Sequence, residues 1–119
     1  MSELPTTAYK VLTADQMAAL ERDGGFAGAP VDVADGYIHM SAEAQLTETV
    51  DKHFAGQGDL HVAAIDLEAL GSALRWEKSR GGALFPHLYA PLPLGSVIAY
   101  GPLERDDTGA VKPPGPAEL

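Results

Sequence analysis

Three short stretches of the sequence hold most of the side chains that can move a proton or stack against a flat ligand. They are residues 37–41, 76–77 and 85–89. An imidazole beside a hydroxyl can transfer a proton or bind a sugar diol, and rigid aromatic rings suit stacking. We therefore predict one site assembled across the fold. Its candidate residues are Tyr37, His39, Ser41, Trp76, Glu77, Arg80, His87 and Tyr89.

His39 is the first candidate catalytic residue. It stands between Ile38 and Met40 in a short predicted strand, so its side chain points to the opposite face from theirs. On that face it either enters a cleft or bonds a neighbouring carbonyl as a structural histidine. Ser41, two residues on, either places its hydroxyl beside His39 or caps the helix that follows.

Glu77 is the second candidate catalytic residue, as a base or an electrostatic stabiliser. Trp76 beside it is expected to anchor that strand in the core. In residues 85–89, Pro86 restricts the backbone, and the rings either stack on a ligand or form a structural cluster under a loop. We predict no metal site, because the spacings of His39, His87 and Glu77 match no local ligand motif.

Composition limits the partners of this site. The 17 acidic and 8 basic residues give a net charge of −9, which repels nucleic acid and anionic membranes. A basic cluster, Arg75, Lys78 and Arg80, either holds the phosphates of a small ligand or is a solvated face. The chain has no cysteine, which excludes disulfides and thiolate nucleophiles.

No segment reads as a signal peptide or as a membrane span, which needs ~20 apolar residues. We expect a cytoplasmic protein that is a monomer or a weak homo-oligomer. One globular domain is predicted over residues 1–103, followed by a flexible tail over residues 104–119 that is rich in charge and proline.

An α+β domain with small, bent, mostly antiparallel sheets and two main helices should position these side chains. A capping box at Thr13 predicts one helix to about Asp23, and a second helix follows Ser41 with Leu46 and Val50 on one stripe. Residues 26–35 are expected to form a surface loop. Strands are predicted at residues 9–12, 37–40, 60–66, 74–77 and 97–100.

Residues 35–41, 76–77 and 85–92 resemble the domain of unknown function 952 family, and the resemblance runs from about residue 9 to residue 103. That family's fold is grouped with ADP-ribosyltransferase-like proteins, which bind NAD in a cleft between two small, strongly bent sheets. The sequence departs from those transferases in showing no complete catalytic triad in recognisable order. It also lacks the arginine–histidine set of the related RNA phosphotransferases.

The resemblance implies roles for the candidate residues. His39 with Ser41 would lie at the ribose of NAD, and Tyr89 or Trp76 would stack on the nicotinamide. Glu77 would be the acidic residue that stabilises an oxocarbenium-like transition state.

We therefore expect an ADP-ribosyltransferase-like domain that binds a nucleotide-type small molecule, with NAD as the candidate substrate. It would transfer ADP-ribose or cleave the nicotinamide–ribose bond. The alternative is a non-catalytic small-molecule-binding or protein-interaction module on the same fold. The two differ in whether an acidic residue faces the His39 pocket.

Overall fold

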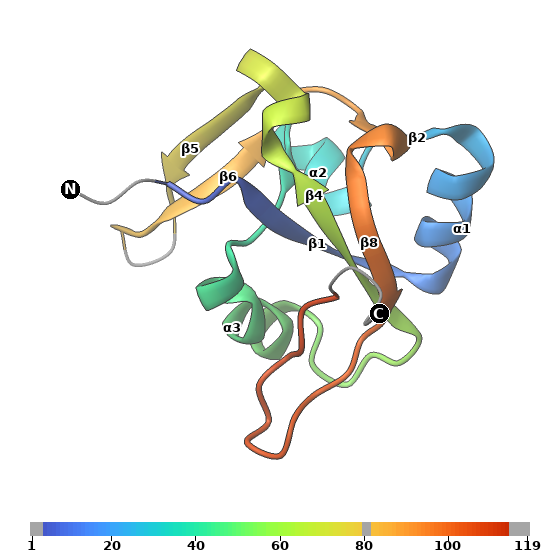
Figure 1. The fold of residues 1–119 in the computed structure, drawn as a ribbon, viewed down its shortest axis with the longest axis vertical. Helices are drawn as coiled ribbons and strands as arrows, with labels where there is room; N and C mark the ends of the chain where they lie inside the picture. Colours follow the sequence, from blue (N-terminus) through green and yellow to red (C-terminus); the bar gives the residue numbers. More distant parts are fainter. Residues whose placement is uncertain (1–3, 80–81, 115–119) are drawn as a thin grey trace.

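The computed structural model describes residues 4–79 and 82–114. Its centre is a three-stranded antiparallel sheet with the strand order β1-β4-β8 (Figure 1). The strands are β1 (Thr7–Thr13), β4 (Leu60–Asp66) and β8 (Val97–Pro102). As predicted from its apolar composition, β4 is the central strand, and four of its seven residues in succession are buried.

A second three-stranded sheet, with the order β3-β6-β5, carries most of the candidate side chains. Its strands are β3 (Ile38–His39), β6 (Leu84–Leu88) and β5 (Leu74–Lys78). A small third sheet pairs β2 (Gly25–Phe26) with β7 (Leu92–Pro93). All of these strand pairs are antiparallel, which confirms an α+β fold with several small antiparallel sheets.

Strand β6 was not among the predicted strands because Pro86 interrupts it. The structure nevertheless places β6 at the centre of its sheet. The carbonyl of Pro86 accepts from the backbone N–H of Met40, so the missing N–H of Pro86 points to that same side. The paired residues of β3 and β6 end at His39 and His87, so the bond that proline cannot donate lies at the end of this ladder.

Both predicted helices are present. Helix α1 (Ala14–Asp23) begins with the predicted capping box of Thr13 and Gln16 and ends at Gly24 in the left-handed conformation. Helix α3 (Glu43–His53) buries Leu46 and Val50 as predicted.

The predicted role of Ser41 as the N-cap of α3 is wrong, because the residue before the first helical turn is Ala42. The carboxamide of Gln45 reaches back to accept from the N–H of Ala42 at 2.9 Å. Ser41 instead forms a backbone bridge with Tyr9 of β1, which ties the start of α3 to the central sheet.

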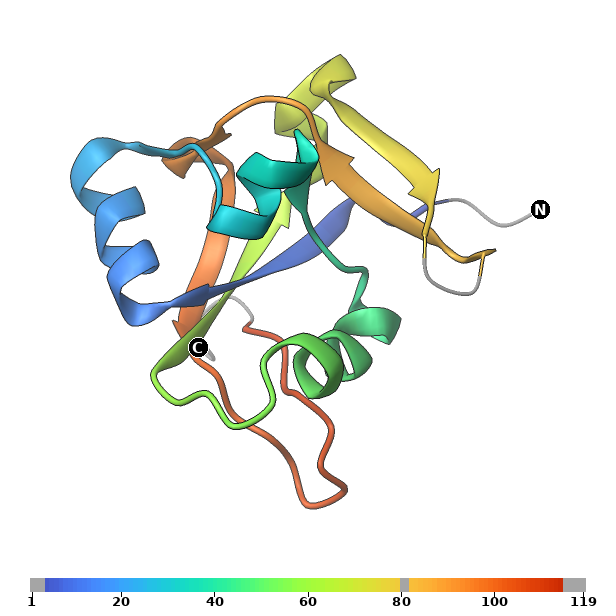
Figure 2. The same cartoon turned by 180° about the vertical axis from the view of Figure 1, so that it is seen from behind.

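The prediction of a surface loop at residues 26–35 is wrong, because α2 (Pro30–Asp35) forms there. Its apolar residues Val31 and Val33 are exposed while its one buried residue is Asp32, so it shows no apolar stripe. Seen from behind (Figure 2), α2 lies in front of the central sheet, between α1 and the hairpin of β5 and β6. Two 3₁₀ segments, η1 (Leu67–Ala73) and η3 (Leu94–Ser96), complete the elements.

The core lies on both faces of the central sheet, as the alternation of β1 requires. Leu12 packs with Leu20, Ile65 and Leu88 on one face. On the other face, Val11 belongs to a smaller cluster that contains the buried side chains of α3. The second sheet therefore shares the larger core cluster, while its outer face remains available for polar side chains.

Two residues of the predicted flexible tail, 104–119, contact α3, and residues 115–119 of that tail lie outside the described residues. Val111 is buried in the smaller core cluster, and its N–H donates to the Thr47 hydroxyl at 2.8 Å. The Arg105 guanidinium donates to Asp51 of α3 at 2.8 Å. One apolar side chain within a polar segment is a weak sequence signal, and only its distant partner reveals its role.

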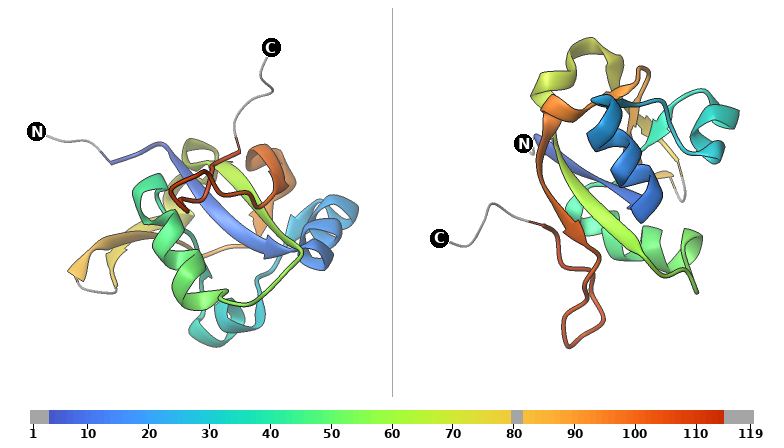
Figure 3. Two further views of the ribbon diagram at one scale, coloured as in Figure 1. Left: turned by 90° about the horizontal axis from the view of Figure 1, so that it is seen from below. Right: turned by 90° about the vertical axis from the view of Figure 1, so that its right-hand side faces the viewer.

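Figure 3 shows two arms that project from this body. One is the hairpin of β5 and β6, and the other is the loop that follows β8. Among the described helices, none is long and apolar enough to cross a membrane.

Candidate functional site

The outer face of the second sheet brings the two candidate histidines together. In the register of β3 and β6, His39 lies directly opposite His87, while their neighbours Ile38 and Leu88 pack into the core on the other face. The ring centroids of the two histidines are 5.7 Å apart. The predicted convergence of these two segments, nearly fifty residues apart in the chain, is therefore confirmed.

A pocket of about 530 Å³ opens beside these rings. It extends from α2 and β3 along β1 to α3, and its wall contains both histidines and Ser41. The polar and aromatic residues that form its histidine end are Lys10, Asp32, Asp35, Tyr37, His39 and His87.

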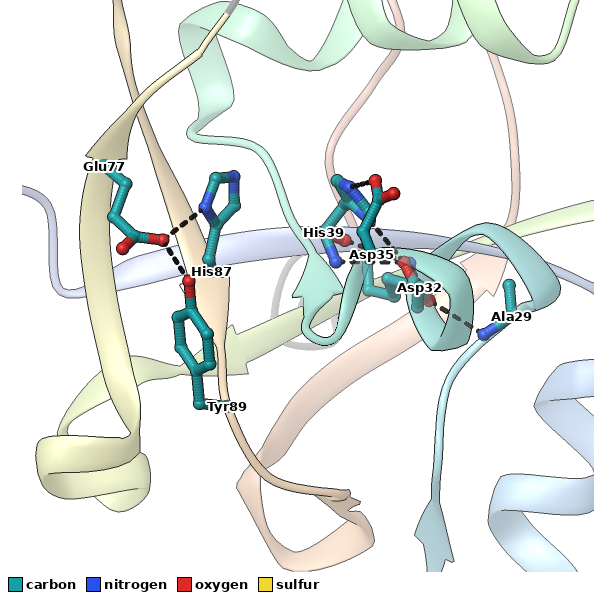
Figure 4. A network of polar contacts seen from close by, with 8 residues as sticks. Ala29, Asp32, Asp35, His39, Glu77, His87 and Tyr89 are labelled. Carbon is teal, nitrogen blue, oxygen red and sulfur yellow. Dashed lines mark hydrogen bonds and ion pairs between the residues drawn. The ribbon is translucent and has the colours of Figure 1, made fainter.

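Asp32 is the centre of the pocket's polar network (Figure 4), and the sequence analysis did not identify it. Its side chain is 1% exposed. One carboxylate oxygen accepts from Lys10 Nζ at 2.9 Å and from the N–H of Ala29 at 2.8 Å. The other accepts from His39 Nδ1 at 2.6 Å and from the His39 backbone N–H at 3.1 Å.

The local sequence explains this position. Asp32 is the third residue of a helix that begins with Pro30, where a carboxylate can accept from the backbone before the first turn. Gly28 lets the chain pass close by, because it has a φ of 124° and any Cβ there would lie 2.9 Å from that of Asp32. Pro30 followed two residues later by Asp32 was the sequence pattern that could have predicted this helix start and its carboxylate.

The Asp32 carboxylate is charged. Burial by itself raises the pKa of Asp32, but the hydrogen bond from His39 and the positive charge of Lys10 outweigh it and hold that pKa well below its usual value. Burial lowers the pKa of Lys10, and the neighbouring Asp32 opposes that shift. Lys10 also donates to the carbonyl of His39 at 3.0 Å, so this buried pair fixes both the backbone and the ring of His39.

The His39 ring lies between two carboxylates. Its Nδ1 contacts Asp32, and its Nε2 is 2.9 Å from Asp35 Oδ2. A carboxylate only accepts hydrogen bonds, so both bonds form together only when both ring nitrogens carry protons. The His39 side chain is 34% exposed, and the ring can therefore present a positive edge to the pocket.

Glu77 holds the second histidine. One of its oxygens accepts from His87 Nδ1 at 2.8 Å and from the Tyr89 hydroxyl at 2.7 Å. The hydrogen bond from His87, followed by that from Tyr89, lowers the pKa of Glu77. The hydrogen bond between the Tyr89 hydroxyl and Glu77 raises the pKa of Tyr89. Glu77 is absent from the residues that line the pocket in the described part of the chain, and it reaches the pocket through His87.

Tyr37 contacts three other rings beside these pairs. Tyr37, His87 and Tyr89 are called the ring stack, after the stacked pair of Tyr37 and His87. Tyr37 lies on His87 with centroids 4.1 Å apart and planes 25° apart. It also contacts Tyr89 at 5.2 Å and His39 at 4.7 Å. Burial, with smaller contributions from the charges of Asp35 and Glu77, raises the pKa of Tyr37. The sequence analysis thus identified residues that lie in contact with one another.

Ser41 is in the pocket wall and Trp76 is on the core face of β5, and the side-chain contacts of both are away from the two histidines. The Ser41 hydroxyl is 2.7 Å from that of Thr49, so its recorded partner is α3 rather than His39. Trp76 lies on the opposite face of β5 from Glu77 and packs against the larger core cluster, not against the rings of the site. Arg80 lies outside the described residues. Arg75, from the same predicted basic cluster, lies over the Tyr89 ring at 5.1 Å from its centroid.

Solved structures similar to this chain come from one bacterial protein. The crystal structure of protein CC0527 from Caulobacter crescentus has a TM-score of 0.82 at 45% sequence identity, covering 90% of this chain and 94% of that chain. A crystal structure of its double mutant gives a TM-score of 0.82 at 43% identity. The solution NMR structure of CC0527 gives 0.76 at 45% identity, covering 90% of this chain and 91% of that chain.

No curated protein matches the sequence. A family model does match it, over residues 11–100, and that model is described as "Protein of unknown function (DUF952)". The matched range begins within β1 and ends within β8, so it contains both histidine–carboxylate pairs and the ring stack. The chain therefore belongs to the DUF952 family.

Proposed function

We propose that the pocket binds a nucleotide-type small molecule, with NAD as the candidate substrate, and that the domain is ADP-ribosyltransferase-like. The observation that carries this proposal is the contact of Tyr37 with His87 and Tyr89, beside the carboxylates of Asp35 and Glu77. A planar base can stack on these rings, and carboxylates accept hydrogen bonds from ribose hydroxyls.

The charges of the site favour the nicotinamide end of NAD. The ring of nicotinamide is cationic while it is joined to ribose, and both aromatic faces and carboxylates attract a cation. Lys10 and Asp32 neutralise one another, which leaves Asp35 and Glu77 as negative groups near the rings. Arg75, which lies over Tyr89, is the nearby cation that can hold a phosphate.

The same arrangement supports transfer chemistry. Cleavage of the nicotinamide–ribose bond develops positive charge on the sugar, and a fixed carboxylate lowers the energy of that transition state. Acidic residues do face the His39 pocket, because Asp32 and Asp35 are part of its wall. This was the feature by which the sequence analysis separated a transferase from a binding module.

The binding-module alternative has its own support. The Glu77 oxygen nearest the rings already accepts from both His87 and Tyr89. A carboxylate engaged in this way can hold the ring stack in place without stabilising a substrate. The alternative therefore keeps ligand binding but predicts no turnover.

Thermal unfolding in the presence of NAD, ADP-ribose or nicotinamide tests the proposal. A ligand at 100 times its Kd adds ~2.7 kcal/mol to the free energy of unfolding, and NAD should raise the Tm. Tyr37→Leu should abolish that rise. Tyr100→Leu, at an exposed tyrosine of β8, is the matched control and should keep it. If none of the three compounds changes the Tm, the proposal is wrong.

Release of free nicotinamide from NAD then separates the two functions. The transferase reading predicts release that depends on the intact site. Stable binding of NAD without release would favour the binding module.

A further inference from the structure

We infer that His87, oriented by Glu77, is the proton acceptor for the hydroxyl that attacks the bound nucleotide. This inference deepens the proposed function and rests on it. It assigns the reacting proton to one nitrogen atom, Nε2 of His87, and makes Glu77 a positioning residue rather than the group that contacts the sugar.

The contact with Glu77 fixes the tautomer of His87. Glu77 is a carboxylate and only accepts, so the 2.8 Å contact places a proton on His87 Nδ1. In the neutral ring, Nε2 then carries the free electron pair. Figure 4 shows Nε2 pointing away from Glu77. Within residues 4–79 and 82–114 the structure records no hydrogen bond to Nε2, and His87 is part of the pocket wall.

His39 differs from His87 in the contacts of its ring nitrogens. Both nitrogens of the His39 ring contact carboxylate oxygens, so that ring has no electron pair to offer while both bonds are made. The two rings thus differ in the partners of their nitrogens, although their centroids are only 5.7 Å apart. His39 is suited to donate or to stabilise negative charge, whereas His87 is suited to accept a proton.

The His87 ring is held rigidly by its neighbours. Its side chain is 4% exposed, and Tyr37 covers it at a centroid distance of 4.1 Å. Tyr89 donates to the same Glu77 oxygen that accepts from His87, which fixes the carboxylate in turn. A base that is held in one orientation needs no reorganisation when the reaction occurs.

The proposed step is hydrolysis of the nicotinamide–ribose bond with His87 Nε2 as the proton acceptor. A water molecule gives one proton to His87 Nε2 while its oxygen forms a bond to the anomeric carbon of the ribose. The bond from that carbon to the nicotinamide nitrogen breaks, and its electron pair leaves with neutral nicotinamide. The products are ADP-ribose, nicotinamide and a protonated His87, which returns its proton to solvent. An alcohol in place of water gives transfer by the same step.

The test measures NAD affinity and single-turnover nicotinamide release separately. His87→Gln should lower the rate by about 10²- to 10⁴-fold, the usual contribution of a general base, with little change in NAD affinity. His61→Gln, at a histidine outside the residues that line the pocket, is the matched control and should keep the rate. In His87→Ala, added imidazole should restore part of the rate, which a purely structural defect would not allow.

Nitrogen-15 NMR of the unaltered protein provides a measurement that does not depend on any variant folding. With the ring neutral, the proton of His87 should be on Nδ1, and Glu77→Ala should allow the other tautomer to appear. A proton on Nε2 in the unaltered protein would overturn the inference whatever the ligand.

The two proposals fail in different ways. Absence of NAD binding removes the proposed function and the inference with it. Release that is unchanged in His87→Gln overturns the inference alone. Binding without any nicotinamide release overturns the inference and favours the binding module over the transferase.

Discussion

The two histidine–carboxylate pairs of this site share one kind of contact, from Nδ1 of the imidazole to a carboxylate oxygen, but differ in which partner is buried. His39 Nδ1 meets Asp32 at 2.6 Å, and His87 Nδ1 meets Glu77 at 2.8 Å. In the first pair the carboxylate is 1% exposed and the imidazole 34% exposed. In the second pair the imidazole is 4% exposed and the carboxylate 36% exposed. The buried partner is therefore the carboxylate in the first pair and the imidazole in the second.

This difference separates structure from chemistry. Asp32 is buried beside Lys10. Its carboxylate accepts hydrogen bonds from the Lys10 ammonium and from the backbone N–H groups of Ala29 and His39. Glu77 is 36% exposed, and among the described residues its hydrogen bonds are to side chains of the site itself. Loss of Asp32 should therefore lower the stability of the fold, while loss of Glu77 should alter the contacts of the ring stack.

The largest expected effect is that of Asp32→Ala. Removing one member of a buried ion pair costs about 3–5 kcal/mol, because Lys10 remains buried without its counter-charge. Urea denaturation should show this loss as a lower midpoint with an unchanged slope. Asp35→Ala, on the exposed side of the same helix, is the control and should shift the midpoint only slightly. Similar shifts for both variants would contradict the comparison.

A smaller effect should appear in acid. Because the pKa of Asp32 is lowered on folding from its ordinary value of 3.8, its contribution to stability is present above that value and declines as the pH falls below it. The free energy of unfolding should therefore fall more steeply between about pH 5 and pH 2 in the unaltered protein than in Asp32→Asn. Denaturant titrations across this range measure both slopes, and parallel slopes would assign the acid sensitivity to other carboxyls.

The smallest effect concerns Glu77. Glu77→Ala should leave the urea midpoint nearly unchanged, because the side chain is exposed at the sheet surface. It should lower the pKa of Tyr89 towards its ordinary value of 10.0, since the hydrogen bond to Glu77 is the main cause of the upward shift. Carbon-13 NMR of the Tyr89 ring follows this titration. A Tyr89 pKa that does not move would break the proposed link between Glu77 and the ring stack.

The sequence by itself determined those features that depend on neighbouring residues. The capping box at Thr13, the apolar stripe of α3 and the buried run of β4 are local patterns, and all three formed as predicted. The strict alternation of strands also placed the side chain of His39 on the face opposite that of its neighbours. The contact of His39 with His87, by contrast, required β3 to pair with β6, a strand that the sequence did not predict.

Only the tertiary structure decided which charges are buried. Asp32 follows Val31 in an exposed turn of helix, and nothing nearby in the sequence indicates that Lys10, 22 residues earlier, reaches it. The same holds for Val111, which is buried by α3. Burial depends on what packs above a side chain, and those partners come from distant segments. The free energy of a buried ion pair is likewise a property of the assembled fold rather than of either residue.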